Sequence, residues 1–171
     1  HCNAACCRQK RKFVKSEFVM TKAKSGLKIA IAGLGVVGSE VARQLINRYD
    51  ELGMVAGQSL DVVAVSARDR SADRAFSLDG IDWYDDATQL ATRDDVDIIV
   101  EMIGGSEGVA LDLARASLSS GKHFVTANKA MIAHHGTELA QLAEANNAHL
   151  MFEAAVAGGI PAVKTLREGL A

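Results

Sequence analysis

The residues with the clearest chemical meaning form the hexapeptide Gly33-Leu34-Gly35-Val36-Val37-Gly38. An apolar run precedes it and an amphipathic pattern follows it, so the glycines join an expected strand to an expected helix. In this setting the first glycine permits a tight turn, the second lets a pyrophosphate approach the backbone, and the third lets helix and strand pack closely. Free N–H groups and the helix dipole would then bind the phosphates of a dinucleotide. The alternative is that the glycines serve the turn alone.

The stretch Ser66-Ala67-Arg68-Asp69-Arg70, at the end of the second expected strand, bears on the choice of dinucleotide. A site selective for NAD usually has an acidic residue here, which accepts hydrogen bonds from the ribose 2′-hydroxyl. Arg68 could instead pair with a 2′-phosphate and stack on adenine, which favours NADP. Two alternatives stay open: Asp69 could be the ribose acceptor, or Arg68 and Arg70 could be solvated loop charges.

Strands and helices are expected to alternate along the chain. Short apolar runs predict strands at residues 27–32, 61–66, 96–101, 123–126 and 149–153. Apolar residues at helical spacing predict helices after the glycine turn and at residues 84–93, 109–119 and 137–146, whereas residues 53–59 look like a turn. This alternation is typical of an α/β fold with a Rossmann-type, doubly wound parallel sheet.

Composition indicates one ordinary globular domain with extensions. The chain has 171 residues, of which 49% are hydrophobic and 23% charged, and its formal net charge is -2. So small a charge gives no strong attraction for nucleic acid or anionic lipid, and no apolar run is long enough to cross a bilayer. We therefore expect a soluble, cytoplasmic protein with a small-molecule partner, which binds neither nucleic acid nor membrane.

The N-terminal stretch is basic and contains all three cysteines, Cys2, Cys6 and Cys7. They lack a CxxC pair and a second ligand cluster, so we expect no zinc site, and the rest of the chain has no thiol. We interpret residues 1–26 as a disordered leader or non-native extension, with Met20 as a candidate natural start. A transit peptide is the alternative.

Two other pairs of polar residues could be catalytic but have simpler interpretations. His134 and His135 could be acid and base or metal ligands, but adjacent side chains point in different directions, which favours a loop or helix-entry position. Asp97 and Glu101 share one face of an expected strand, where they could form a carboxylate pair. We favour the interpretation that they mark the two ends of that strand.

Three further stretches, VEMIGG (100–105), VTANKA (125–130) and FEAAVAGGIP (152–161), resemble homoserine dehydrogenases when taken with the glycine turn. The likeness is to the amino-terminal half of those enzymes and runs from Leu27 to Ala171. It implies reduction of aspartate 4-semialdehyde to homoserine with NADPH or NADH, in threonine and methionine biosynthesis. It also places Ile103 and Gly104 beside the cofactor.

The same resemblance places Lys129 at the nicotinamide end of the site, where a cation could hold an anionic cofactor or polarise a carbonyl. The alternative for Lys129 is a surface lysine that caps a helix. The family further implies a monovalent cation, usually sodium. Its ligands would be the Glu153 carboxylate and carbonyl oxygens of Val156, Gly158 and Ile160.

After the leader or extension at 1–26, the resemblance divides the chain into an NAD(P)-binding domain at 27–152 and a hinge with the first helix of a substrate domain at 153–171. Members of the family continue into that domain, which supplies a catalytic lysine, so this fragment is expected to bind NADP, or NAD, but to be inactive alone. We expect a homo-oligomer at full length, and poor solubility of the fragment through exposed apolar surface. The alternatives are another amino-acid dehydrogenase, such as an aspartate dehydrogenase, and an NAD(P)-sensing domain without turnover.

Overall fold

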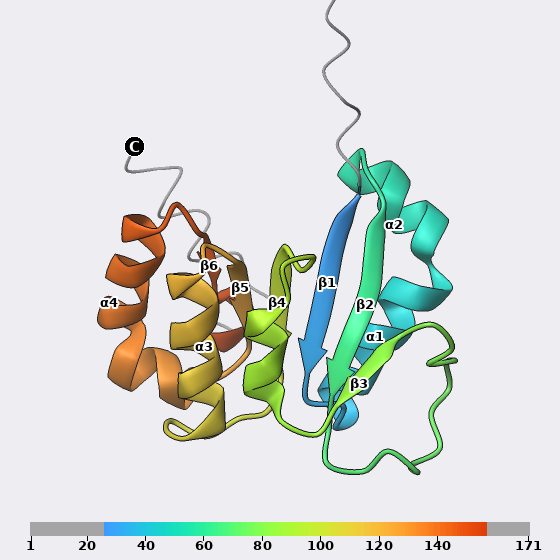
Figure 1. Cartoon of the computed structure of the whole chain (residues 1–171), viewed down its shortest axis with the longest axis horizontal. Coiled ribbons are helices and arrows are strands. Elements are labelled where there is room, and N and C mark those ends of the chain that lie inside the picture. Colours follow the sequence, from blue (N-terminus) through green and yellow to red (C-terminus); the bar gives the residue numbers. More distant parts are fainter. Residues whose placement is uncertain (1–25, 157–171) are drawn as a thin grey trace, which may run out of the picture.

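A six-stranded parallel sheet forms the centre of the computed structural model, which describes residues 26–156 (Figure 1). The strand order is β3-β2-β1-β4-β5-β6, and every neighbouring pair is parallel. The strands are β1 (Leu27–Ala32), β2 (Leu60–Ser66), β3 (Asp82–Tyr84), β4 (Ile98–Glu101), β5 (His123–Thr126) and β6 (Leu150–Met151). This order confirms the predicted Rossmann-type, doubly wound sheet.

Helices cover both faces of the sheet (Figure 1). α1 (Val36–Asn47) and α2 (Tyr49–Ala56) lie on one face, and α3 (Val109–Ser119) and α4 (Lys129–Ala145) on the other. Two short 3-10 helices, η1 (Ala87–Thr92) and η2 (Glu153–Ala155), complete the described elements. Among residues 26–156, no helix is long and apolar enough to span a membrane.

Side chains of β1 alternate between two hydrophobic clusters, one on each face of the sheet. Ile29 and Ile31 belong to the cluster under α1, whereas Ala30 and Ala32 belong to the cluster under α3 and α4. The small alanines leave room for larger side chains of the second cluster, such as the fully buried Leu113 of α3. A strand buried on both faces explains why its sequence is an unbroken apolar run.

Three connections differ from the sequence prediction. The expected turn at 53–59 is shorter, because α2 continues to Ala56 and ends at Gly57, which has a φ of 70°. The expected helix at 84–93 is the end of β3 followed by η1, whose first turn is capped by the Asp86 side chain. β6 covers only two residues of the strand expected at 149–153.

The largest difference is α4, which the sequence predicts at 137–146 but which begins at Lys129. The Asn128 side chain caps it by accepting a hydrogen bond from the backbone N–H of Met131, at 3.1 Å. The fully buried Met131 then anchors the first turn. His134 and His135 therefore lie inside a helix, and the predicted loop or helix-entry position is wrong.

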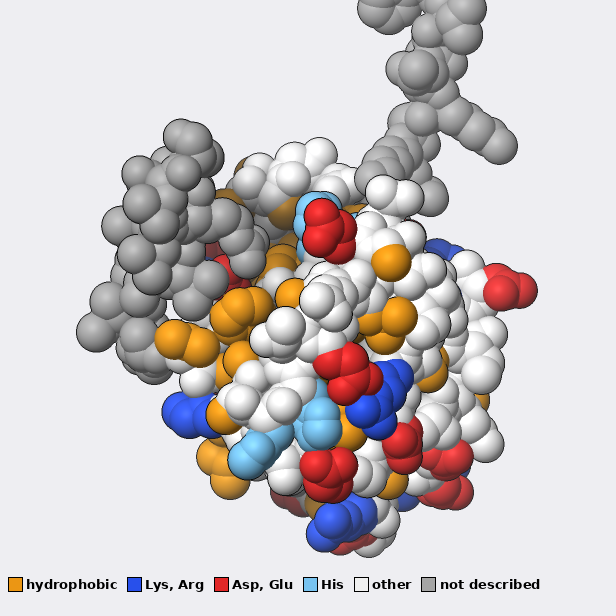
Figure 2. Space-filling model, turned by 90° about the vertical axis from the view of Figure 1, so that its left-hand side faces the viewer, with side chains coloured by type: hydrophobic (Ala, Val, Ile, Leu, Met, Phe, Trp, Pro, Cys, Tyr) orange, Lys and Arg blue, Asp and Glu red, His pale blue; other side chains and the backbone are white. Residues whose placement is uncertain are grey.

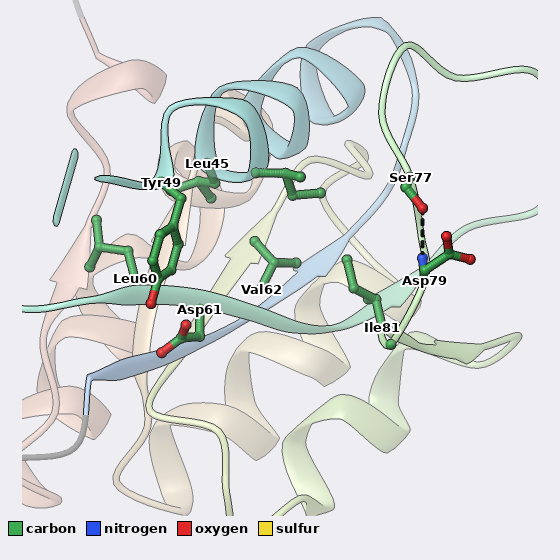
Figure 3. A pocket seen from close by; sticks show the side chains of 10 residues that line it. Leu45, Tyr49, Leu60, Asp61, Val62, Ser77, Asp79 and Ile81 are labelled. Carbon is green, nitrogen blue, oxygen red and sulfur yellow. Dashed lines mark hydrogen bonds between the residues drawn. The ribbon is translucent and has the colours of Figure 1, made fainter. Parts of the chain in front are cut away.

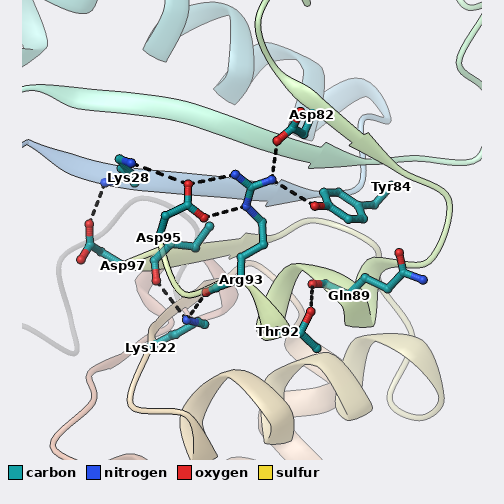
Figure 4. A network of polar contacts seen from close by, with 10 residues as sticks. Lys28, Asp82, Tyr84, Gln89, Thr92, Arg93, Asp95, Asp97 and Lys122 are labelled. Atoms are coloured by element: carbon teal, nitrogen blue, oxygen red, sulfur yellow. Dashed lines mark hydrogen bonds and ion pairs between the residues drawn. The ribbon is translucent and has the colours of Figure 1, made fainter.

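A polar network closes the sheet at the amino ends of β3 and β4 (Figure 4). The Arg93 guanidinium donates to the carboxylates of Asp95, at 2.9 Å, and Asp82, at 2.5 Å, and to the Tyr84 hydroxyl, at 3.0 Å. Lys122 donates in turn to the carbonyl oxygen of Arg93, at 2.5 Å. The hydrogen bond from Arg93 lowers the pKa of the Asp95 carboxyl. These contacts join the end of η1 to β3 and to the segments that precede β4 and β5.

We predict that Arg93→Met lowers the free energy of unfolding by about 1–2 kcal/mol, because the Arg93 side chain is only 17% exposed and its three partners, two of them solvent-exposed carboxylates, share it as a donor. Arg43→Met is the matched control, since its ion pair with Glu40 lies on the exposed face of α1 and should contribute much less to stability. Urea unfolding measures both. Because the folded Asp95 has a lowered pKa, its part of the Arg93 effect is complete above the unfolded pKa of about 3.9 and disappears as the pH falls through the folded value. Equal losses in the two variants would contradict the prediction.

Candidate functional site

A cleft of about 650 Å³ opens at the carboxyl ends of β1, β2 and β4. The chain leaves β1 toward β2 and later returns to β4 on the other side of β1, so the strand order reverses at this point. In open α/β sheets, ligands bind in the crevice at such a reversal. Five residues that the sequence predicts to bind a cofactor line the cleft: Gly33, Leu34, Gly35, Arg68 and Ile103.

The glycine turn forms the floor of this cleft. Gly33 has a φ of 97°, which favours glycine, and its N–H donates to the carbonyl oxygen of Ser66 at 2.8 Å. A Cβ added at Gly38 would lie 1.8 Å from the carbonyl oxygen of Gly33, so α1 and β1 pack backbone against backbone. A Cβ added at Gly35 would meet nothing within 4 Å, because this glycine faces the open cleft.

The first turn of α1 is suited to an anion. Gly35 is its N-cap, no side chain caps it, and no acidic residue lies in that turn. Its N–H groups and the positive end of the helix dipole are therefore available to a phosphate. Val36 and Val37, which are 92% and 59% exposed, contribute backbone to this turn, but their side chains do not line the cleft.

The loop after β2 forms one end of the cleft and carries Arg68 and Asp69. Arg68 is exposed and makes no hydrogen bond or ion pair with any residue of 26–156. Asp69 is engaged by its own loop, since its Oδ1 accepts from the backbone N–H of Ser71 at 2.9 Å and from the Ser71 hydroxyl at 2.7 Å. These bonds, the hydroxyl first, lower the pKa of Asp69.

Arg74 also lines the cleft, and the sequence analysis did not single it out. Its guanidinium donates to the carbonyl oxygens of Asp69 and of Ala72, the latter at 2.9 Å, and lies 5.3 Å from the ring centre of Trp83. Arg74 thus folds the loop back on itself beside β3. The three arginines within residues 68–74 indicate a basic loop at the cleft. Their spacing does not show which arginine is free to bind a ligand and which one binds carbonyl groups of its own loop.

Glu101 is the second residue with an unexpected role. It is fully buried at the end of β4, where its Oε1 accepts from the N–H groups of Ile103, at 2.6 Å, and Gly104, at 3.0 Å. Asp97 lies at the other end of β4 and accepts from the backbone N–H of Lys28 at 2.8 Å. The two carboxylates therefore mark the ends of the strand, as favoured from the sequence, and do not form a pair.

Lys129 is the first residue of α4 and is exposed, without a hydrogen bond or ion pair among the described residues. It does not line the cleft itself. Its neighbour Asn128 donates from Nδ2 to the carbonyl oxygen of Gly105 at 2.6 Å, which brings the start of α4 against the loop that follows β4. Gly104 is exposed on that loop.

Comparison with known proteins agrees with this geometry. The family model described as "Homoserine dehydrogenase, NAD binding domain" matches residues 33–153. The chain belongs to this family.

Relatives named homoserine dehydrogenase confirm the resemblance. The chain is 46% identical over 147 residues to the Corynebacterium glutamicum protein, covering 86% of this chain and 33% of that one. It is 40% identical over 144 residues to the Neisseria gonorrhoeae protein, covering 84% and 32%. The chain thus spans about a third of the length of these homoserine dehydrogenases.

Solved structures of the family share the fold. The homoserine dehydrogenase from Thiobacillus denitrificans matches with a TM-score of 0.74 and 35% identity, over 85% of this chain and 33% of that one. A hyperthermophilic archaeal homoserine dehydrogenase in complex with NADPH matches with a TM-score of 0.66 and 28% identity, over 84% of this chain and 48% of that one. The chain therefore carries the NAD-binding domain of the homoserine dehydrogenase family, as its glycine turn and later motifs predict.

The two histidines of α4 do not form a metal site, and no group of three or more His, Cys, Asp or Glu side chains in residues 26–156 could hold a metal. Instead, His135 lies 2.8 Å from Glu107 through Nε2, and 3.5 Å from Glu138 through Nδ1. Glu138 also binds Arg115 of α3 at 2.7 Å. Acidic, basic and histidine side chains accordingly lie side by side on this face of the molecule (Figure 2).

The sodium ligands expected from the resemblance are only partly within the described residues. Glu153 begins η2 and Val156 follows its end, so both lie just after β6. Gly158 and Ile160 lie outside the described residues, as do the cysteines of the N-terminal stretch. The sodium site stays a prediction.

A second hollow of about 440 Å³ lies between α1, the start of β2 and the loop before β3 (Figure 3). Apolar side chains such as Leu45 and Val62 form its floor, with Asp61 and Asp79 at its rim. None of the residues that the sequence predicts to bind a cofactor lines it. Its position at the amino end of β2 also differs from the usual ligand position in such sheets.

The glycine turn allows a matched test. We predict that Gly35→Ala lowers thermal stability only slightly, as alanine is a poorer N-cap than glycine, but weakens NADPH binding at least tenfold, because its methyl group enters open space that a pyrophosphate would fill. Gly38→Ala should instead destabilise the fold by about 3 kcal/mol, because its methyl group meets the Gly33 carbonyl. Circular dichroism melting and calorimetric titration separate the effects. Unchanged NADPH affinity in a folded Gly35→Ala variant would exclude the turn as the phosphate site.

Proposed function

We propose that this chain is the cofactor-binding part of a homoserine dehydrogenase, which transfers hydride between NAD(P)H and aspartate 4-semialdehyde to give homoserine. The observation that carries the proposal is the meeting of an uncapped glycine turn, the 103–105 loop and the start of α4 at the carboxyl edge of one sheet, in a chain of this family. The dinucleotide supplies the hydride when bound. The protein's own residues bind it, orient it and hold the substrate beside it.

The phosphates and the adenosine end have separate binding residues in this proposal. N–H groups of residues 33–38 bind the pyrophosphate, and Arg68 pairs with the 2′-phosphate of NADP. The guanidinium of Arg68, which is exposed and has no partner among residues 26–156, favours NADP over NAD, because it can pair with a 2′-phosphate that only NADP carries. A solved relative in complex with NADPH supports a nicotinamide cofactor in this cleft.

Lys129 orients substrate or cofactor at the nicotinamide end. A lysine that stabilises a helix lies near its C-terminus, where the dipole is negative, whereas Lys129 lies at the N-terminus of α4. Its charge is therefore unfavourable for the helix and is better explained by an anionic or carbonyl ligand. A positive group there can stabilise charge that develops on the carbonyl oxygen during hydride transfer.

Further parts of the proposal rest on the family resemblance. They are a cofactor domain at 27–152 with a hinge at 153–171, a monovalent cation held by Glu153 with the carbonyl oxygens of Val156, Gly158 and Ile160, a homo-oligomeric enzyme, and a cytoplasmic location. Carboxylate and carbonyl oxygens are hard ligands that suit sodium.

The cofactor preference can be tested on the chain itself. We predict that Arg68→Ala weakens NADPH binding about 10- to 100-fold and leaves NADH binding unchanged, because only NADPH has the 2′-phosphate. Arg70→Ala is the control, since Arg70 lies 5.9 Å from the ring centre of Trp83 and does not line the cleft. Calorimetric titration with both dinucleotides gives the affinities. Equal losses for NADPH and NADH would overturn the role of Arg68.

The activity can be tested in a chimaera. We predict that replacing the matched region of the Corynebacterium glutamicum enzyme with residues 27–171 of this chain preserves NADP-dependent oxidation of homoserine. Lys129→Ala in the chimaera should lower kcat/KM about 100-fold, with NADPH affinity changed much less, because the lysine acts at the reacting end. Absorbance of NADPH, followed over a range of homoserine concentrations, gives kcat/KM. A folded chimaera that binds NADPH but does not reduce NADP when homoserine is added would contradict the proposed function.

A further inference from the structure

Glu101 is a carboxylate that the proposed function does not use. It is fully buried at the end of β4, and no lysine, arginine or histidine among residues 26–156 forms an ion pair with it. A charged or polar group in the core destabilises a protein unless hydrogen bonds compensate its lost hydration. An apolar residue would serve a buried strand better, so the carboxylate needs another explanation.

The hydrogen bonds of Glu101 go to two separate loops. Oε1 accepts from the N–H groups of Ile103, at 2.6 Å, and Gly104, at 3.0 Å, in the loop after β4. Oε2 accepts from the hydroxyl of Thr126, at 2.6 Å, at the end of β5. Both oxygens of the Glu101 carboxyl group therefore have hydrogen-bond partners.

Thr126 and Asn128 close these bonds into a ring. Oγ1 of Thr126 accepts from the backbone N–H of Asn128 at 2.9 Å, and Asn128 donates from Nδ2 to the carbonyl oxygen of Gly105 at 2.6 Å. Thr126 is fully buried and Asn128 nearly so. The ring therefore runs from Glu101 through the loop after β4 to Asn128, and back through Thr126.

The loop after β4 depends on this ring for its shape. Gly104 and Gly105 have φ values of 84° and 89°, and a Cβ added at Gly104 would meet nothing within 4 Å. Two consecutive glycines without packed side chains have many alternative conformations. Hydrogen bonds to a rigid, buried acceptor select one of them.

We infer that Glu101 is a positioning residue, whose carboxylate joins the cofactor loop at Ile103–Gly105 to the turn that starts α4 and presents Lys129. It touches neither cofactor nor substrate, since it is buried beneath both loops. The inference rests on the proposed function, which assigns the Ile103–Gly105 loop to the cofactor and Lys129 to the nicotinamide end. The Glu101 carboxylate would then fix the position of Lys129 relative to that loop. Loosening one loop should therefore loosen the other.

The test removes the hydrogen bond of Thr126 to Glu101 and measures amide hydrogen exchange in the loop after β4. In Thr126→Val, which keeps the shape but removes the hydroxyl, we expect the amides of Ile103 and Gly104 to exchange hydrogen about tenfold faster. Thr126→Ser keeps the hydroxyl and should restore slow exchange. Hydrogen exchange followed by NMR on the chain without cofactor reports each amide separately.

The control is Ser117→Ala in α3, which also removes a buried hydroxyl, one that donates to the carbonyl oxygen of Leu113 at 2.6 Å. It should destabilise the fold without selective acceleration at Ile103 and Gly104. Glu101→Met is a second cut, because a side chain of similar length without a carboxylate cannot replace the hydrogen bonds to either loop, and it should accelerate exchange at Asn128 as well as at Ile103. Exchange at Ile103 and Gly104 that is unchanged in Thr126→Val, or is raised equally by Ser117→Ala, would overturn the inference.

The two proposals fail differently. If the wild-type chain does not bind NADPH, the proposed function fails, whereas the exchange experiment still decides whether the ring couples the loops. If the wild-type chain binds NADPH and Thr126→Val matches it in both exchange and affinity, the positioning role fails and the proposed function stands. We expect the Thr126→Val variant to bind NADPH several-fold more weakly, and Thr126→Ser to bind like the wild type.

Discussion

The close approach of α1 to β1 is the constraint on which the rest of the site depends. Because the carbonyl oxygen of Gly33 occupies the space that a side chain at Gly38 would need, helix and strand can meet only backbone to backbone. That contact aims the first turn of α1 at the reversal of strand order, where the neighbouring strands also end. An uncapped helix start, a cleft and the loops after β2 and β4 are thereby brought to one place.

The polar residues at the two ends of the sheet have different tasks. At the amino ends, Arg93 and its carboxylate partners satisfy one another and hold η1 against the sheet. At the carboxyl ends, Arg68 and Lys129 have no partner among the described residues, whereas Glu101 and Arg74 bind backbone groups of the loops that surround them. Charged side chains that are free to bind a ligand therefore lie near charged side chains that hold the loop backbone in place. This arrangement is expected of a binding site whose loops must be rigid.

Much of this could be predicted from the sequence, because it depends on local pattern. The glycine spacing, the strands at 27–32 and 123–126 and the helix at 109–119 are properties of short stretches, and the structure has them as predicted. The start of α4 could not be found this way, since the cap at Asn128 and the burial of Met131 outweigh the weak helical signal before Gly136. Glu101 and Thr126 lie far apart in the chain, so only the pairing of β4 with β5 makes them neighbours. Arg74 likewise gains its role from Trp83, which a separate strand brings beneath it.

The most direct test of the account is to locate the cofactor by NMR, in a titration of the isotope-labelled chain with NADPH. The account predicts that the largest chemical-shift changes fall on the amides of residues 33–38, 68–69 and 103–105. Changes concentrated around Tyr49 and Ile81, in the second hollow at the amino end of β2, would contradict it, as would the absence of saturable changes anywhere in the chain.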